Sequence, residues 1–318
     1  MTQAQQLSLF TPGASDASAA PLSEPHEPTR RSTLVAATGA FHDEMVRRGL
    51  SKHTIKAFLL DLKLFASYAG ADQQVGGISS RQIGGYLHWL QHERDVKCSA
   101  KSLERRLTTL KVFFAWLAEI EVIGVDPAAP MIHQPAPDPL PKILYEQQVT
   151  RLLSTTRQMI ATEKPDARPH LLASLLLHTG IKKGECAAIR LEHIDLSDGQ
   201  APSLWVRYGN PRYARKERRL SLPKDFTDTL AAYRAQYHPG EKLFECSMRN
   251  LEYVLTHAGT EASLTEGVSF EGLRMTAAVR DYKAGMAPET MRKKYGLSEI
   301  TWKSETLPRI KQLADPPL

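Results

Sequence analysis

The 318-residue sequence is poor in cysteine. Its three cysteines are Cys98, Cys186 and Cys246. Their spacing is neither that of a metal site nor that of a disulfide framework. We therefore predict buried thiols in a reducing cytoplasm, with no metal and no other cofactor.

Long hydrophobic runs and secretion signals are also absent. The longest mostly apolar run, residues 171–177, is broken by His178 and Gly180, whereas a bilayer-spanning helix needs roughly 20 apolar residues. The first thirty residues lack the basic start and apolar stretch of a secretory signal. These absences predict a cytoplasmic protein without a membrane partner.

Positive charge is in modest excess. The chain has 41 lysines and arginines against 35 aspartates and glutamates, a formal net charge of +6. This balance fits a nucleic-acid partner, but many basic proteins have no such partner. The location of the cations along the chain must therefore decide.

The first half of the sequence predicts a tail followed by a helical domain. Residues 1–32 are rich in proline, serine and alanine without an apolar period, which predicts a flexible tail. Residues 33–126 show apolar residues three and four apart, with Ser51 as a helix N-cap and Gly70 as a helix end. Further helices are expected over residues 80–94 and 100–118. A compact helical bundle follows from this pattern.

A proline-rich stretch, residues 127–141, denies helix to most of its length and predicts a linker. Residues 142–318 then form a second domain. A helix over residues 169–179 ends at Gly180, and the segments S-L-W-V-R-Y and R-R-L-S-L-P alternate as strands joined by a hairpin. The expected fold class is mainly α, with a small antiparallel sheet in the second domain.

Three phrases carry a resemblance to a known family: T-G-I-K-K-G-E-C-A-A-I-R-L-E-H-I-D-L, Y-G-N-P-R-Y-A-R-K-E-R-R-L-S-L-P and G-L-R-M-T. Over residues 35–310 the chain resembles the tyrosine recombinases, or phage integrases, of the Xer type. The resemblance implies a SAM-like helical core-binding domain and a catalytic domain that close as a clamp around duplex DNA. It also implies catalysis by a tyrosine nucleophile, two arginines, a lysine and two histidine or tryptophan side chains.

Most of the family's catalytic groups are replaced in this sequence. By the resemblance, the catalytic positions fall on Lys182, Glu271, Arg274, Leu297 and Thr306. Lysine at the first arginine position keeps the charge but loses the bidentate fork. Glu271, Met275 and Leu297 stand where the family has histidines, and a threonine hydroxyl is far harder to ionise than a phenol. We therefore predict a vestigial pocket and no strand cleavage.

Arg274 is the family residue that survives in the second arginine position. The resemblance implies that it faces a phosphate. The alternative is an internal ion pair with Glu271, three residues earlier and one helical turn away.

Cations on the hairpin and on the first domain are the candidate DNA contacts. Residues 207–219 gather arginines, a lysine and two tyrosines on the loop that reaches DNA in the family. The candidate DNA-binding residues are Lys52, Lys56, Lys101, Arg105, Arg207, Arg212, Arg215, Lys216, Arg218 and Arg274.

The tail contains one short motif. Gln6, Leu7, Ser8, Leu9 and Phe10 resemble the peptide by which bacterial proteins dock on the replicative sliding clamp. A peptide in a flexible tail can become ordered on a partner. We therefore consider the sliding clamp a partner beside double-stranded DNA.

Three functions remain open at this point. The first is a catalytically inactive DNA-binding relative, associated with nucleoid or plasmid, in the replication, recombination or regulation of a mobile element. The second is an active or partner-dependent recombinase with a displaced nucleophile, assembled with itself or a related recombinase. The third is an interaction scaffold that no longer binds DNA.

Overall fold

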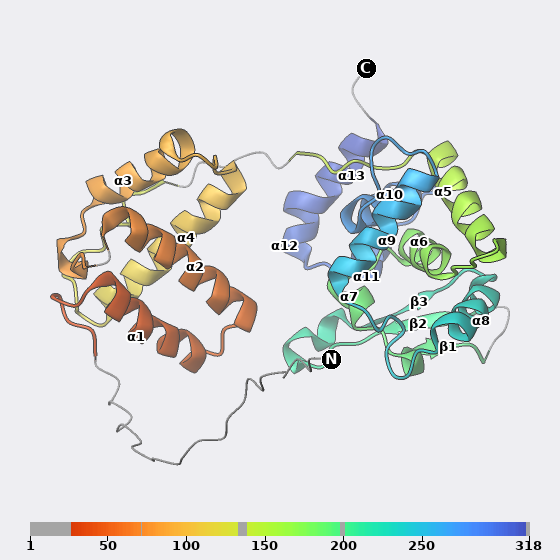
Figure 1. Ribbon diagram of the computed structural model, residues 1–318, viewed down its shortest axis with the longest axis horizontal. Coiled ribbons are helices and arrows are strands. Elements are labelled where there is room, and N and C mark those ends of the chain that lie inside the picture. The colour runs from red at the N-terminus through yellow and green to blue at the C-terminus, as the bar shows by residue number, and fades with distance from the viewer. Residues whose placement is uncertain (1–26, 71, 133–138, 198–200, 316–318) are drawn as a thin grey trace, which may run out of the picture. The chain divides into compact units, whose positions relative to one another are not determined.

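The computed structural model describes residues 27–70, 72–132, 139–197 and 201–315. The chain divides into two compact units, residues 1–138 and 139–318 (Figure 1). The candidate clamp motif, residues 6–10, lies outside the described residues. So do residues 133–138 of the expected linker.

The first unit is a bundle of helices. Its elements are α1 (Leu34–Arg47), α2 (Lys52–Ala69), the 3-10 turn η1 (Val75–Gly77), α3 (Ser80–His88), the π-helical turn η2 (Trp89–Glu93) and α4 (Ala100–Glu119). The four α-helices each begin after a hydroxyl residue whose side chain accepts a backbone N–H, which satisfies an otherwise unpaired donor. These caps are Thr33, Ser51, Ser79 and Ser99.

Aromatic rings fill the core of this bundle. Phe65 packs edge-on against Tyr86 with ring centroids 5.0 Å apart, and Phe113 and Phe114 are 5.1 Å apart. All four side chains are fully buried. Edge-to-face packing of such rings stabilises a core beyond the area that they bury, so the bundle has a hydrophobic core of its own.

The second unit places helices around a small sheet (Figure 1). Its helices are α5 (Glu146–Gln158), α6 (Arg168–Thr179), α7 (Lys183–Ala187), α8 (Phe226–Tyr237), α9 (Met248–Glu261), α10 (Phe270–Lys283), α11 (Pro288–Lys294), α12 (Glu299–Thr301) and α13 (Leu307–Ala314). The strands β1 (Ile194–Asp195), β2 (Ser203–Val206) and β3 (Arg218–Ser221) form an antiparallel sheet in the order β1-β2-β3. Short turns complete it: η3 (Met159–Ala161), η4 (Leu191–His193), η5 (Pro211–Lys216) and the π-helical η6 (Trp302–Thr306).

Helix α6 lies in the centre of this unit and contacts α5, α8, α9 and α10. It is apolar on nearly every side, as a helix enclosed by neighbours should be. It ends at Gly180, whose φ of 59° is left-handed, a conformation that glycine adopts without strain. This helix end matters for the site, because the Gly180 carbonyl accepts a hydrogen bond from Arg274.

The expected fold class is confirmed: the described chain is mainly helical with one small antiparallel sheet. The helix ends expected at Ser51, Gly70 and Gly180 are also confirmed. The helix expected over residues 80–94 is wrong in part, since α3 ends at His88 and continues as the π-helical turn η2. No helix in the described ranges is long and apolar enough to cross a bilayer.

Candidate nucleic-acid interface

A pocket of about 300 Å³ lies at the start of α10. Lys182, Glu271 and Arg274 line it together, although they come from two segments nearly ninety residues apart. Ser269 caps α10 by accepting the N–H of Gly272 at 3.0 Å. The free N–H groups and dipole of a helix start add positive potential here, which favours an anion.

Arg274 is held in this pocket by backbone carbonyls. Its Nη1 donates to the Gly180 carbonyl and its Nη2 to the Tyr295 carbonyl at 2.8 Å. The guanidinium lies over the Tyr295 ring, 5.3 Å from its centroid. Burial lowers the pKa of Arg274, but an arginine in a protein stays charged. The pocket therefore contains a fixed positive charge.

The alternative ion pair between Arg274 and Glu271 is not observed. Within the described ranges, no hydrogen bond or ion pair joins the two side chains, and Glu271 is exposed. The reason is geometric: both terminal nitrogens of Arg274 turn toward the ends of α6 and α11, away from its own helix.

Lys182 supplies the second cation. Its Nζ lies 3.4 Å from the Gly296 carbonyl, and its backbone N–H donates to Glu185 Oε2 at 2.8 Å. Burial lowers the pKa of Lys182, and the nearby Arg274 lowers it further, while the charge of Glu185 opposes both. A lysine near other cations attracts an anion more strongly than one exposed alone.

Leu297 and Thr306 do not join this cluster. Leu297 packs against an apolar cluster that contains the buried side chains of Met275 and Tyr295. Thr306 ends η6 just before α13. Neither Leu297 nor Thr306 lines the pocket that the described residues form around Arg274.

The basic loop that joins β2 to β3 projects its cations from a short 3-10 turn, η5. Arg212 and Arg215 are exposed at its tip. Arg207 stacks on the Trp205 ring at 5.5 Å, and Lys216 on the Tyr213 ring at 5.2 Å. The tip thus presents positive charges and aromatic faces, the groups that contact phosphates and bases.

Arg218, one of the predicted DNA contacts, is bonded to partners within the protein. Its side chain is only 9% exposed, and it forms a bidentate ion pair with Glu185, with Nη1–Oε1 and Nη2–Oε2 distances of 3.1 and 2.9 Å. Its Nε donates to the Lys294 carbonyl at 2.6 Å. Glu185 also accepts the Tyr208 hydroxyl. Arg218 therefore fixes the base of the loop.

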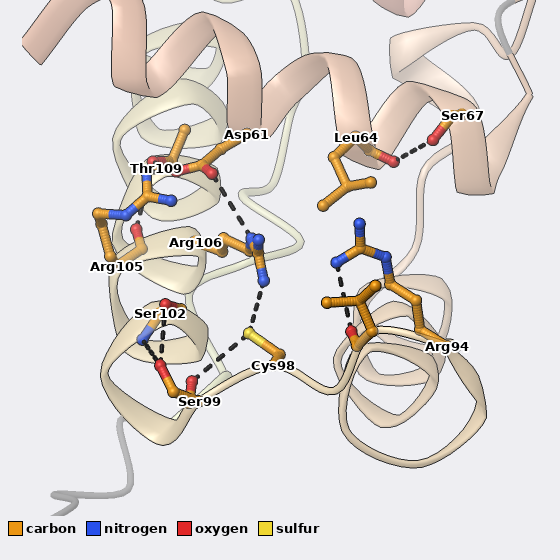
Figure 2. Close-up of polar contacts among 11 residues, drawn as sticks. Asp61, Leu64, Ser67, Arg94, Cys98, Ser99, Ser102, Arg105, Arg106 and Thr109 are labelled. Carbon is orange, nitrogen blue, oxygen red and sulfur yellow. Dashed lines mark hydrogen bonds and ion pairs between the residues drawn. The ribbon is translucent and has the colours of Figure 1, made fainter.

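On the first unit, Lys52 and Lys56 are exposed on α2, and Lys101 is exposed on α4. Arg105 differs, because it is bonded to Asp61, a carboxylate that is 4% exposed and also accepts the Thr109 hydroxyl at 3.0 Å (Figure 2). Its side chain remains 45% exposed. Arg105 thus has a structural role in addition to any contact with DNA.

The sequence reading missed the two carboxylates that organise these cations, Glu185 and Asp61. Glu185 follows Lys182 by three residues at a helix start, which is a capping position. That signal was available in the sequence. Asp61 is an acid on the apolar stripe of α2, and a buried acid requires a positive partner.

Comparison with known proteins shows which proteins this chain resembles. Residues 41–120 match the model of the phage integrase N-terminal SAM-like domain. The chain is 26% identical over 252 residues to the tyrosine recombinase XerD of Listeria monocytogenes serotype 4b. The aligned region covers 79% of this chain and 80% of that protein. The chain is thus similar to tyrosine recombinases over most of its length, and residues 41–120 carry the match to the phage integrase SAM-like domain.

Two further proteins are similar to this chain, one in sequence over about half of its length and one in fold. The tyrosine recombinase XerC of Xanthomonas campestris pv. campestris is 29% identical over 175 residues, 54% of this chain and 52% of that protein. The chain thus spans about half the length of these first relatives. A lambda integrase tetramer bound to a Holliday junction has a TM-score of 0.67 at 16% identity, over 91% of this chain and 81% of that one. At this identity, the similarity is one of fold.

Proposed function

We propose that this tyrosine recombinase relative binds duplex DNA through both units and does not itself cleave strands. The observation that carries the proposal is the exposed, basic and aromatic loop tip near a pocket with two cations, Lys182 and Arg274. A phosphate fits such a pocket. Lys52, Lys56, Lys101 and Arg105 would contribute phosphate contacts from the first unit.

The absence of cleavage is argued from the chemistry at the family's positions. The nucleophile position is Thr306, and its hydroxyl is a poor nucleophile and a poor leaving group for resealing. Glu271 adds a negative charge to the lining of the pocket, which opposes the charge that builds on a phosphate during transfer. Leu297 and Met275 donate no hydrogen bond.

Tyr295 is not suited to act as a displaced nucleophile. Tyr295 is 1% exposed and its hydroxyl donates to Asp281 Oδ2 at 2.6 Å. Burial raises the pKa of this phenol, and the charge of Asp281 and its hydrogen bond raise it further. A nucleophile needs an accessible and ionisable hydroxyl, so Tyr295 serves as a packing residue.

Two measurements on the full-length chain test the proposal. Gel shifts on genomic DNA fragments recovered with the protein should show binding that weakens steeply as salt increases. Nicked half-sites built from the same DNA should yield no covalent adduct on a denaturing gel. An adduct mapped to Tyr282, Tyr295 or Thr306 would establish instead an active or partner-dependent recombinase, and no shift at low salt would leave an interaction scaffold.

We further propose recruitment to the replicative sliding clamp by residues 6–10, with Leu9 and Phe10 as apolar anchors, in the replication, recombination or regulation of a mobile element. The support is the motif in the sequence. A short peptide that becomes ordered on binding should reach micromolar affinity, about 8 kcal/mol. Titration of the tail peptide against purified clamp should saturate, and the Leu9→Ala plus Phe10→Ala peptide should not bind. Equal binding of the two peptides would remove the clamp from the proposal.

Self-association, or association with a related recombinase, is part of the same proposal. The lambda integrase structures of similar fold are a dimer and a tetramer on DNA. Sedimentation of the protein with and without its DNA should show a larger complex on DNA. A single protomer per site at saturation would argue against it.

A further inference from the structure

Asp61 is a carboxylate enclosed between two helices of the first unit. It lies on α2 and is 4% exposed. Its Oδ2 accepts hydrogen bonds from Arg105 Nη1 and, at 3.0 Å, from the Thr109 hydroxyl, and its Oδ1 lies 3.6 Å from Arg106 Nε. Figure 2 shows these side chains of α4 around Asp61. A buried charge requires such partners, so groups of α4 fix the position of this carboxylate.

The bond to Asp61 occupies only part of Arg105. Arg105 donates to Asp61 through Nη1, and within the described ranges its side chain forms no other hydrogen bond. The Arg105 side chain is 45% exposed, whereas that of Arg106 is 15% exposed. A guanidinium has five N–H donors in a rigid plane. Nε and Nη2 of Arg105 can therefore donate to an outside acceptor while Nη1 stays on Asp61.

We propose that Asp61 is a positioning residue for DNA, which holds the Arg105 guanidinium in the orientation that contacts a phosphate. The inference rests on the proposed DNA binding by the first unit. A long side chain that becomes ordered only on binding loses rotamer freedom, and this loss weakens affinity. Asp61 orders Arg105 before DNA arrives, so the loss falls on folding and not on binding. A buried acid thus strengthens the binding of a negatively charged ligand.

The proposal reverses the sign that charge alone predicts. An acid near DNA repels phosphates, so its removal should strengthen binding. If Asp61 orders Arg105, Asp61→Asn should instead weaken binding, because a neutral amide holds a guanidinium less firmly than a carboxylate does. We expect a loss of about two- to tenfold in affinity, which corresponds to the ordering of one long side chain.

Glu119 provides a matched control in the same unit. It accepts a hydrogen bond from Arg48 Nη2 at 3.0 Å, and the Arg48 side chain is 46% exposed, close to the value for Arg105. Glu119 itself is 63% exposed, and Arg48 has a second acid, Glu44, as a partner. Arg48 is not a candidate DNA contact. Glu119→Gln therefore removes one negative charge without loosening a candidate contact, and DNA binding should stay the same or become slightly stronger.

The test measures gel-shift affinities of the full-length protein for the genomic DNA fragments recovered with it, at one low salt concentration. Arg105→Ala should weaken binding. Asp61→Asn should weaken binding while Arg105 is present and should add nothing in the double variant, since coupled residues are not additive. Thr109→Val is a milder second variant that removes one donor to Asp61 and no charge. It should also weaken binding only while Arg105 is present, and circular dichroism should show that each variant is folded.

Two results would overturn the proposal and leave DNA binding intact. One is affinity that is unchanged or increased in Asp61→Asn, as expected for Glu119→Gln. The other is equal weakening by Asp61→Asn with and without Arg105, which would show a general loss of structure. Absence of any gel shift by the native protein at low salt would instead refute the proposed function, and this inference with it.

Discussion

Replacing Arg218 with methionine removes the charge that balances Glu185 but retains an unbranched side chain in the same space. Both partners are almost fully enclosed, at 9% and 3% side-chain exposure. Removing one partner of a buried ion pair leaves the other charge uncompensated and costs about 3–5 kcal/mol. For a domain of this size, that loss lowers the melting temperature by on the order of 10 °C.

The loss should depend on pH. Burial raises the pKa of Glu185, but the hydrogen bonds and charge of Arg218, together with hydrogen bonds from Tyr208 and the Lys182 backbone, lower it by more, so its pKa lies below the ordinary value. In the native protein, Glu185 thus adds stability above its unfolded pKa, and this stability is lost as pH falls through the folded pKa. In Arg218→Met, burial dominates and the folded pKa is raised. The folded variant then binds a proton more readily than the unfolded chain, and its deficit shrinks as pH falls from about 7 to about 5.

Calorimetry of the full chain at the two pH values measures the loss of stability in Arg218→Met. It can resolve the transition of the second unit when the two units melt separately. Arg219→Met is the matched control: the neighbouring arginine on β3 also pairs with an acid, Asp195, at 2.7 Å, but its side chain is 52% exposed. An exposed pair contributes about 0–1 kcal/mol. Equal losses for Arg218→Met and Arg219→Met, or a loss from Arg218→Met that does not change with pH, would refute the reasoning.

Three further outcomes are expected. Replacing Arg207, Arg212 and Arg215 with alanine should flatten the slope of log affinity against log salt by up to about three units in gel shifts, and an unchanged slope would show that the loop does not touch phosphates. Tyr86→Phe should stabilise the first unit by about 1 kcal/mol in urea unfolding, because it removes a buried hydroxyl without a partner. Asp61→Asn should destabilise the same unit by about 3 kcal/mol, because two arginines lose their counter-charge; a loss below about 1 kcal/mol would contradict this.

Local signals in the sequence were sufficient to predict the helix ends at Ser51 and Gly180. Ser51 and Gly180 mark helix ends through bonds to residues a few positions away, so their roles depend on neighbours in the sequence. The π-helical turn after His88 was not predictable, because it has the same apolar spacing as a regular helix. The pocket of Lys182, Glu271 and Arg274 was predicted as a set only because family motifs link these distant positions.

The partners of charged side chains could not be predicted in the same way. Arg218 stands in a run of cations that looks uniformly exposed, yet it pairs with Glu185, thirty-three residues earlier in the chain. Arg105 likewise pairs with Asp61 across two helices. Such pairs depend on how elements meet in space, and neither the period nor the composition of one segment contains that information.

The basic loop is fixed at its base and exposed at its tip. Tyr208 and Arg218 attach its two ends to Glu185, while the 3-10 turn between them, Pro211–Lys216, has no buried residue. Changes at the tip therefore leave the core intact, whereas changes at the base affect stability. If the tip contacts DNA as proposed, a relative of this protein can acquire a new DNA site by substitution at the tip alone, without compensating mutations elsewhere in the fold.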